Sequence, residues 1–269
     1  MKKLIYQVYL GGRSKLYDYC TESVKQYAES IGADYICQKQ PILRIAPNPF
    51  LNQREGKTGG WKKHGYMPIF EKENVFSFFD KYDRCCVVDA DIYIRSDTPD
   101  IFQELDDGSA VGSVYECDLP MNNAYADKIR SYSQMIRLFN IPWRNNQKTG
   151  YDFFNSGVML YDSKLMLKYL RGMTPKQFLE QPELQDLING IGPFKWQSDQ
   201  ITLNYWFKRN NIEVQHLDWK WNALYTAVKD IEPAHFVHFF LKDKLPNGGE
   251  NTEELMKQIG ESHYDESNN

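Results

Sequence analysis

The chain has 269 residues, a formal net charge of −4 and an isoelectric point of about 5.8. This length suits one large α/β domain with a sizeable core, and the acidic balance excludes a broad basic face for a nucleic acid polymer. Five cysteines without a C-x-x-C pair indicate neither a disulfide framework nor a zinc site, so we expect a reduced, cytoplasmic protein.

The apolar segment at the N-terminus is predicted to be the first strand of a sheet. Residues 4–10 are interrupted by Gln7 and followed by Gly11, without the small-residue cleavage site of a signal peptide. No run approaches the roughly 18 apolar residues of a spanning helix. We therefore expect a soluble protein without a transmembrane segment, which could still work at the surface of a membrane.

The spacing of apolar residues predicts alternating strands and helices. Strand 3–10, helix 16–31 and strand 34–37 form a β-α-β opening. Further helices are expected at 68–80, 100–105, 124–139, 163–170, 174–188 and 196–210, and further strands before Asp89 and at 109–115, 158–161, 213–217 and 235–239. The pattern predicts the α/β class, with a central and mostly parallel sheet flanked by helices.

Two polar segments, 39–66 and 118–150, interrupt this alternation. A connection as long as the first is either functional or mobile in a compact domain, and the second is expected to form a lid or an insertion. Neither has the composition of a linker between domains. We therefore expect one domain over 1–260 and a disordered tail at 261–269.

The most informative segment is 85–94, in which an apolar strand leads into Asp89 and Asp91. Carboxylates one residue apart can share a divalent cation, and that cation can hold a diphosphate that the carboxylates alone would repel. The alternatives are a helix cap, a solvated turn, or the phosphatase signature D-x-D-x-[TV]. Tyr93 takes the place of the Thr or Val in that signature, and no later Asp pair follows an apolar strand.

Two histidines lie near the C-terminus on one predicted strand. His235 and His238 face opposite sides of it, so at most one of them lines a shared site. Lys244 follows on a segment that could face a phosphate. A single histidine is more often a core or surface group than a ligand, and from the residues alone that alternative stays open.

Small polar residues mark the ends of two further elements. Asn155 and Ser156 precede an apolar strand, which is the pattern either of an ordinary turn or of a binding site. Ser198 or Asp199 is predicted to cap the next helix. In the functional interpretation, Asp199 and Gln200 lie at the mouth of that helix and point into a cleft.

Taken together, these segments resemble the retaining glycosyltransferases of family 8, which have a GT-A fold. That family has D-x-D after an apolar strand, then F-N-[AS]-G-V-x-x-[ILY], then D-Q-x-x-L-N, and near the C-terminus H-x-x-G-x-x-K-P-W. The corresponding segments of this chain stand in the same order at 89–91, 154–161, 199–204 and 238–246. The resemblance implies a metal-dependent hexosyltransferase that uses a UDP-sugar and retains the anomeric configuration.

The resemblance also implies roles for particular residues. Asp89, Asp91 and His238 would ligate Mn²⁺, with Mg²⁺ the weaker alternative. Asp199 and Gln200 would be the catalytic residues beside the anomeric carbon. The residues implied to bind the nucleotide-sugar are Tyr9, Gly11, Lys72, Ala90, Asn155, Ser156 and Lys244.

The chain departs from the family pattern at Leu241, which replaces the glycine of the last motif, and at Lys72, where arginine is commoner. The first departure leaves an alternative of the same fold, a nucleotide-sugar-binding protein without turnover. Gln200 is a poor nucleophile, so we expect front-face displacement, in which the leaving diphosphate helps to take the proton of the acceptor. The segments 39–66 and 118–150 would meet the acceptor, a glycan, lipid or protein that the sequence does not identify.

Overall fold

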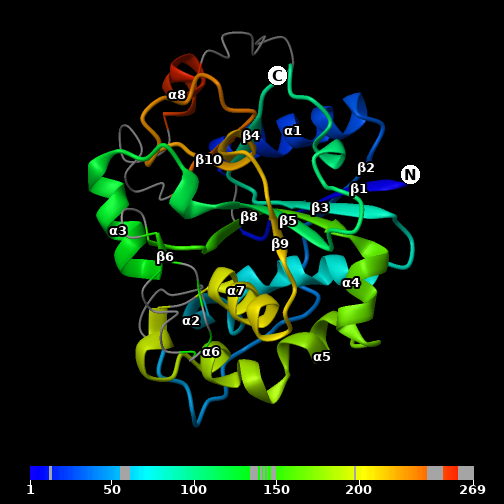
Figure 1. Cartoon of the computed structure of the whole chain (residues 1–269), viewed down its shortest axis with the longest axis vertical. Helices are drawn as coiled ribbons and strands as arrows, with labels where there is room; N and C mark the ends of the chain where they lie inside the picture. Colours follow the sequence, from blue (N-terminus) through cyan, green and yellow to red (C-terminus); the bar gives the residue numbers. More distant parts are fainter. Residues whose placement is uncertain are drawn as a thin grey trace.

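The computed structural model describes residues 1–11, 14–54, 61–133, 139, 141, 143, 145–146, 150–196, 198–240 and 251–259. Its centre is a six-stranded sheet (Figure 1) with the order β2 (Asp34–Gln38), β1 (Lys3–Val8), β3 (Arg84–Val88), β8 (Phe154–Asp162), β5 (Val111–Tyr115) and β9 (Val214–His216). Within it, β8 pairs antiparallel with β3 and β5, and the other pairs are parallel. The predicted α/β class with a mostly parallel central sheet is therefore confirmed.

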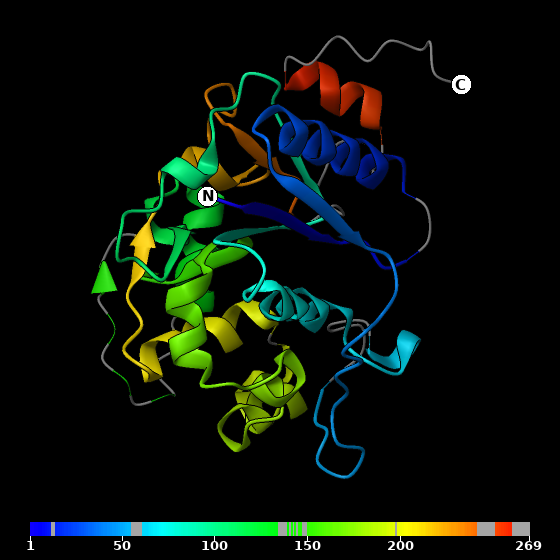
Figure 2. The ribbon, with the colours of Figure 1, turned by 90° about the vertical axis from the view of Figure 1, so that its right-hand side faces the viewer.

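Helices cover both faces of this sheet (Figures 1 and 2). On one side lie α1 (Lys15–Ser30) and, outside it, α8 (Thr252–Gln258). The other side carries the helical segments η2 (Pro68–Phe78), α4 (Ser163–Leu170), α5 (Pro175–Leu179), α6 (Gln185–Asn189) and α7 (Asp199–Arg209). Short elements complete the described chain: α2 (Trp61–His64), η3 (Ile101–Gln103), η4 (Glu116–Asp118), α3 (Asn123–Ser133), β6 (Asn145–Asn146), β7 (Gly150–Tyr151), η6 (Pro182–Leu184), η7 (Gly192–Trp196) and η8 (Trp219–Asn222).

Alternating residues of the central strands fill two separate cores. Leu4 and Tyr6 of β1 point into a core that also contains buried residues of η2, α5 and α7. Ile5, between them, points into the other core, with Val24 of α1 and Phe236. Both faces of β1 are therefore buried, which is why its sequence is nearly continuous in apolar residues.

A second, three-stranded sheet has the order β10 (Ala223–Leu224), β11 (Phe236–His238) and β4 (Ile92–Ile94). Its strand β11 runs antiparallel to β4 and places His238 opposite Ile92. The backbone N–H of Phe239 donates to the carbonyl of Asp91 at 2.8 Å. Residues far apart in the sequence thus meet beside the carboxyl end of β3.

Three predicted helices differ from the structure. The helix expected over 100–105 is reduced to the 3-10 turn η3. The helix expected over 174–188 is divided, because Gln181 is extended before Pro182, and a proline inside a helix lacks the N–H and disfavours a helical residue before it. The segment expected as a helix over 68–80 consists of 3-10 turns. Their three-residue period aligns four buried residues on one face, Phe70, Glu73, Phe76 and Phe79.

The irregular segment after β2 is held by one buried carboxylate, that of Glu71. The backbone N–H groups of Ile42 and Leu43 donate to its Oε2 at 2.8 and 3.0 Å, and that of Arg44 donates to Oε1 at 2.7 Å. The side chain of Gln38 also donates to Oε2, at 2.8 Å. The first part of the long connection is therefore ordered by a residue of η2.

Several predictions concern residues that the structure does not describe. Lys244, Leu241 and the tail 261–269 lie outside the described residues, and the segment 118–150 is described only in part. Within that segment, α3 covers part of the helix expected over 124–139. Across the described ranges, the molecule contains no helix with the length and apolar character needed to cross a membrane.

Candidate active site

Asp89, Asp91 and His238 meet at the carboxyl edge of β3. One ligand atom from each residue lies within 4.8 Å of the other two. The Nε2 atom of His238 is 3.2 Å from Oδ1 of Asp91 and 3.9 Å from Oδ2 of Asp89. Two carboxylates and an imidazole nitrogen so close together form a set of ligands for one divalent cation.

The contact of Nδ1, the second nitrogen of the His238 ring, determines which ring nitrogen keeps its lone pair. Nδ1 lies 2.9 Å from Oδ1 of Asn222. An amide oxygen only accepts, so Nδ1 carries a proton in the neutral ring and the lone pair is on Nε2. The ring also packs directly against Gly157, where an added Cβ would lie 2.5 Å from Cε1 of His238. The imidazole is therefore oriented as a metal ligand.

Lys72 lies between two of the carboxylates. Its Nζ is 2.7 Å from Oδ1 of Asp89 and 2.6 Å from Oδ2 of Asp199. The same atom is 3.3 Å from the carbonyl oxygen of Ser156. Since Lys72 contacts Oδ1 of Asp89, the other oxygen, Oδ2, is the one that faces His238. The ammonium group of Lys72, a residue of η2, thus joins the carboxyl end of β3 to the start of α7.

The charges of this cluster shift one another's pKa. Burial would lower the pKa of Lys72, but the carboxylates of Asp199 and Asp89 outweigh burial and raise it. Burial likewise opposes the charged form of His238, yet Asp91 raises the pKa of the imidazole above its ordinary value. Burial would raise the pKa of Asp91, but His238, a backbone hydrogen bond and Lys72 together lower it, whereas burial raises the pKa of Asp89. Without a metal ion, Asp91 and His238 therefore each favour the charged form of the other.

The structure brings the four polar residues from the second and third motifs to the same place. Ser156 donates from Oγ to Oδ2 of Asp199 at 3.0 Å, and its backbone N–H donates to Oε1 of Gln200 at 3.3 Å. The Oδ1 atom of Asn155 accepts the N–H of Gly157 at 2.9 Å. All four of these polar side chains are buried, Asn155 at 3% and Gln200 at 8% exposure.

The sequence interpretation missed two members of this network, Glu116 and Asn222. Oε1 of Glu116 accepts from Nδ2 of Asn155 and from Nε2 of Gln200, each at 3.0 Å. Oε2 of Glu116 is buried without a hydrogen-bond partner among the described residues, and burial raises the pKa of this carboxyl. Glu116 directly follows β5, whose carboxyl end lies at the same edge of the sheet, and that position is the signal that could have identified it. Asn222 lies in a turn without any such signal.

Three other residues predicted to bind the nucleotide-sugar lie at the same edge of the sheet as the metal ligands. Ala90 lies between the two aspartates. Tyr9 and Gly11 follow the end of β1, which runs parallel to β3 and reaches the same edge. The hydroxyl of Tyr9 accepts the backbone N–H of Ser14 at 3.0 Å, so this tyrosine also helps to place the start of α1.

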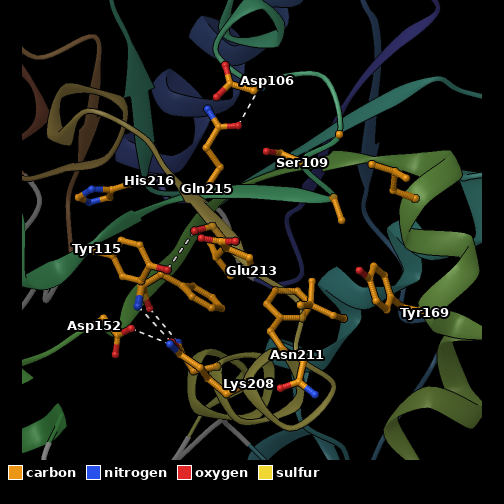
Figure 3. Close-up of a pocket in the computed structure, with 18 of the residues that line it drawn as sticks. Asp106, Ser109, Tyr115, Asp152, Tyr169, Lys208, Asn211, Glu213, Gln215 and His216 are labelled. Atoms are coloured by element: carbon orange, nitrogen blue, oxygen red, sulfur yellow. Dashed lines mark hydrogen bonds and ion pairs between the residues drawn. The ribbon is translucent and has the colours of Figure 1, made fainter. Parts of the chain in front are cut away.

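A separate cavity of about 1180 Å³ runs along the edge strand β9 (Figure 3). None of the residues predicted for the site lines it. Lys208 and Asp152, which face each other in Figure 3, form an ion pair at 2.6 Å, and His216 pairs with Asp118 at 2.5 Å. Among the described residues, three potential metal ligands meet only in the cluster around Asp89, and this cluster is therefore the better candidate for the active site.

Comparison with solved structures identifies the fold. The galactosyltransferase LgtC, solved with donor and acceptor sugar analogues, matches with a TM-score of 0.56 and 14% identity, over 96% of this chain and 95% of that chain. A glycosyltransferase involved in glycosylation of the major capsid of PBCV-1 matches with a TM-score of 0.52 and 14% identity, over 96% of this chain and 100% of that chain. GlyE of Streptococcus pneumoniae TIGR4 matches with a TM-score of 0.51 and 14% identity, over 96% of this chain and 60% of that chain.

No protein-family model matches the chain, and no curated protein matches it either. These three solved structures are glycosyltransferases, and the predicted GT-A fold is confirmed. None of them favours the phosphatase alternative. At this level of identity the similarity establishes the fold, and the activity has to be argued from the site.

Proposed function

We propose that this protein is a metal-dependent, retaining glycosyltransferase that moves a hexose from a UDP-sugar to an acceptor. The observation that carries the proposal is the convergence of Asp89, Asp91 and His238 at the carboxyl edge of a GT-A sheet. Ligands of open α/β sheets bind at that edge. LgtC, which shares this fold, binds donor and acceptor sugar analogues, and this supports a nucleotide-sugar donor here.

The ligand set favours Mn²⁺, because two carboxylates and one imidazole combine hard oxygen ligands with a nitrogen ligand. A bound ion would supply positive charge for the diphosphate and so stabilise the leaving group. The protein residues that would hold it are Asp89 through Oδ2, Asp91 through Oδ1 and His238 through Nε2. Lys244, on the segment after His238, is proposed to contact the diphosphate as a point charge.

The neighbouring residues are proposed to position the donor sugar. Asn155 and Ser156 lie at the start of β8, between the metal ligands and α7. The first turn of α7 carries Asp199 and Gln200, whose side chains are both held by hydrogen bonds. A group that is already oriented loses little entropy when the sugar binds, so this arrangement favours one orientation of the anomeric carbon.

The contacts of Asp199 support front-face displacement. Its Oδ2 atom already accepts from Lys72 and Ser156, so its negative charge is neutralised by a cation and a hydroxyl. A carboxylate stabilised in this way is a weak nucleophile. Gln200 carries no charge. The proton of the acceptor hydroxyl is therefore proposed to pass to the leaving diphosphate.

The test is release of UDP from a panel of UDP-sugars, with Mn²⁺ and with a chelator, in the wild type and in Asp91→Ala. We expect slow hydrolysis of one donor that requires Mn²⁺ and is lost in the variant. Mn²⁺-dependent binding of UDP without release from any donor, even with candidate acceptors, would instead favour the nucleotide-sugar-binding alternative. Release that is insensitive to the chelator and to Asp91→Ala would contradict the proposal.

A further inference from the structure

We propose that Glu116 is a positioning residue: its carboxylate sets, through two asparagine side chains, the tautomer in which His238 presents Nε2 to the metal site. The inference rests on the proposed metal-dependent function, because it assigns a role toward the same ion. It concerns a residue that lies outside the family motifs. Glu116 is buried, at 4% exposure, and contacts none of the three metal ligands in the described hydrogen bonds.

The hydrogen bonds at Glu116 can run in one direction only. An ionised carboxylate can only accept, so both groups that point at Oε1 must donate. Asn155 therefore turns its NH₂ group toward Glu116, at 3.0 Å. Its amide oxygen then faces the opposite way, where it accepts the N–H of Gly157 at 2.9 Å. That backbone N–H is also a donor only, so it favours the same orientation of Asn155, while Glu116 holds the NH₂ end of the amide.

The direction of these hydrogen bonds extends to the imidazole. Nδ2 of Asn222 donates to Oδ1 of Asn155 at 2.9 Å. Because its NH₂ group is used there, Asn222 presents its oxygen to Nδ1 of His238, at 2.9 Å. The neutral imidazole must then carry its proton on Nδ1, and Nε2 keeps the lone pair that a metal ion requires. Each bond in this chain has only one consistent direction.

The same carboxylate oxygen also orients a residue of the proposed catalytic pair. Nε2 of Gln200 donates to Oε1 of Glu116 at 3.0 Å, and Oε1 of Gln200 accepts the N–H of Ser156. One buried acceptor therefore couples the metal ligand to α7. A residue with this role affects metal affinity more than folding, since it acts through the orientation of side chains that stay packed.

The experiment compares Glu116→Ala, Glu116→Gln and the control Ser113→Ala. The hydroxyl of Ser113 lies 2.9 Å from the carbonyl oxygens of both Asn155 and Val158 and can donate to either, so the control removes a buried hydrogen bond at the same place without touching the side-chain amides. Two quantities are measured without donor: the Kd for Mn²⁺, and the tautomer of His238 in the metal-free protein. The tautomer is read from ¹⁵N NMR shifts at a pH where the ring is neutral, with His238→Asn for assignment.

In Glu116→Ala we expect the Kd for Mn²⁺ to rise about 10–100-fold, and the single Nδ1–H tautomer to become a mixture. Glu116→Gln should restore most of the affinity, because its one amide oxygen can accept both bonds. Ser113→Ala should leave both quantities unchanged. Unchanged affinity and tautomer in Glu116→Ala, or equal losses in Ser113→Ala, would overturn the inference.

A double-mutant cycle keeps the test decisive if Glu116→Ala folds poorly. Asn222→Ala breaks the same chain next to the imidazole. Glu116→Met removes the acceptor but keeps most of the buried volume and should weaken Mn²⁺ binding on its own, so combined with Asn222→Ala it should bind Mn²⁺ no more weakly than Asn222→Ala alone. Additive losses would contradict a shared path. If the wild type binds no Mn²⁺, the proposed function fails in its metal dependence, while the tautomer measurement still decides the role of Glu116.

Discussion

Two buried glutamates, Glu71 and Glu116, use the same chemistry for different purposes. Glu71 accepts through both of its oxygens, from three backbone N–H groups and one side chain. Glu116 accepts through one oxygen only, from the side chains of Asn155 and Gln200. The first carboxylate shapes the backbone of a loop, and the second orients amide groups that lead to the candidate active site.

This difference predicts the effect of substituting glutamine for each glutamate. Glutamine has one oxygen and one NH₂ group, so it can replace a carboxylate that uses one oxygen but not a carboxylate that uses two. A buried donor without an acceptor costs about 1–3 kcal/mol. At Glu116 the NH₂ group would replace Oε2, which already lacks a hydrogen-bond partner among the described residues, so no hydrogen bond is lost. The comparison therefore predicts that the same substitution is tolerated at Glu116 and damaging at Glu71.

The largest effect is expected for Glu71→Gln. The new NH₂ group would face either Arg44 N–H or the three donors around Oε2, so we expect the free energy of unfolding to fall by on the order of 3 kcal/mol. Urea denaturation of Glu71→Gln beside Glu116→Gln measures the difference. The folded fraction of Glu71→Gln should keep the Mn²⁺ affinity of the wild type, and a comparable loss of affinity in both variants would break the comparison.

A second prediction concerns Gly157, which the His238 ring covers. The Cβ of Gly157→Ala would meet Nδ1 of His238 at 2.7 Å and Oδ1 of Asn155 at 2.9 Å. Both atoms belong to the hydrogen-bond chain, so the imidazole must move and Mn²⁺ affinity should fall about 10–100-fold. Calorimetric titration with Mn²⁺ checks this. Gly112→Ala, where the nearest atoms are at 3.2 Å and belong to Leu105 and Leu217, is the matched control and should keep the affinity.

The smallest effect is expected at a third buried glutamate, Glu73, whose two oxygens have no hydrogen-bond partner among the described residues. Burial raises the pKa of its carboxyl well above 4.5. A raised carboxyl pKa lowers stability as the pH rises above 4.5, because the unfolded chain ionises first. Glu73→Leu removes this penalty and should stabilise the protein by about 1 kcal/mol at neutral pH.

Thermal unfolding of Glu73→Leu and the wild type between pH 4 and pH 8 measures that effect. The advantage of the variant should grow with pH over this range. An advantage that is constant, or largest at pH 4, would show that Glu73 is ionised and partnered in the folded protein.

The fold and the metal-ligand cluster could be predicted from the sequence where the apolar pattern of a strand and the location of polar residues at its end indicate the same thing. Asp89 and Asp91 follow a strand that is buried on both faces, as in a parallel sheet, and the carboxyl ends of parallel strands lie at the edge where ligands bind. The opposite facing of His235 and His238 followed from the two-residue period of a strand. In the structure His238 is buried at 3% exposure beside the aspartates, while the ring of His235 packs on Trp221.

Two members of the site, Asn222 and Glu116, depended on tertiary contacts. Asn222 reaches His238 because η8 leads into the second sheet, and nothing local to its sequence marks that contact. Glu116 lies in a polar turn that resembles many surface turns, and only the position of β5 beside β8 makes it internal. The division of the 174–188 helix was readable from Pro182, whose effect outweighs the helical spacing of the apolar residues around it.

The most direct test of the central claim is a crystal structure with Mn²⁺ and UDP, in which anomalous scattering locates the manganese. The account predicts one strong peak at coordination distance from Asp89, Asp91 and Nε2 of His238, in contact with the diphosphate. A peak elsewhere, or UDP bound away from the carboxyl edge of β3 with no manganese at these residues, would contradict it.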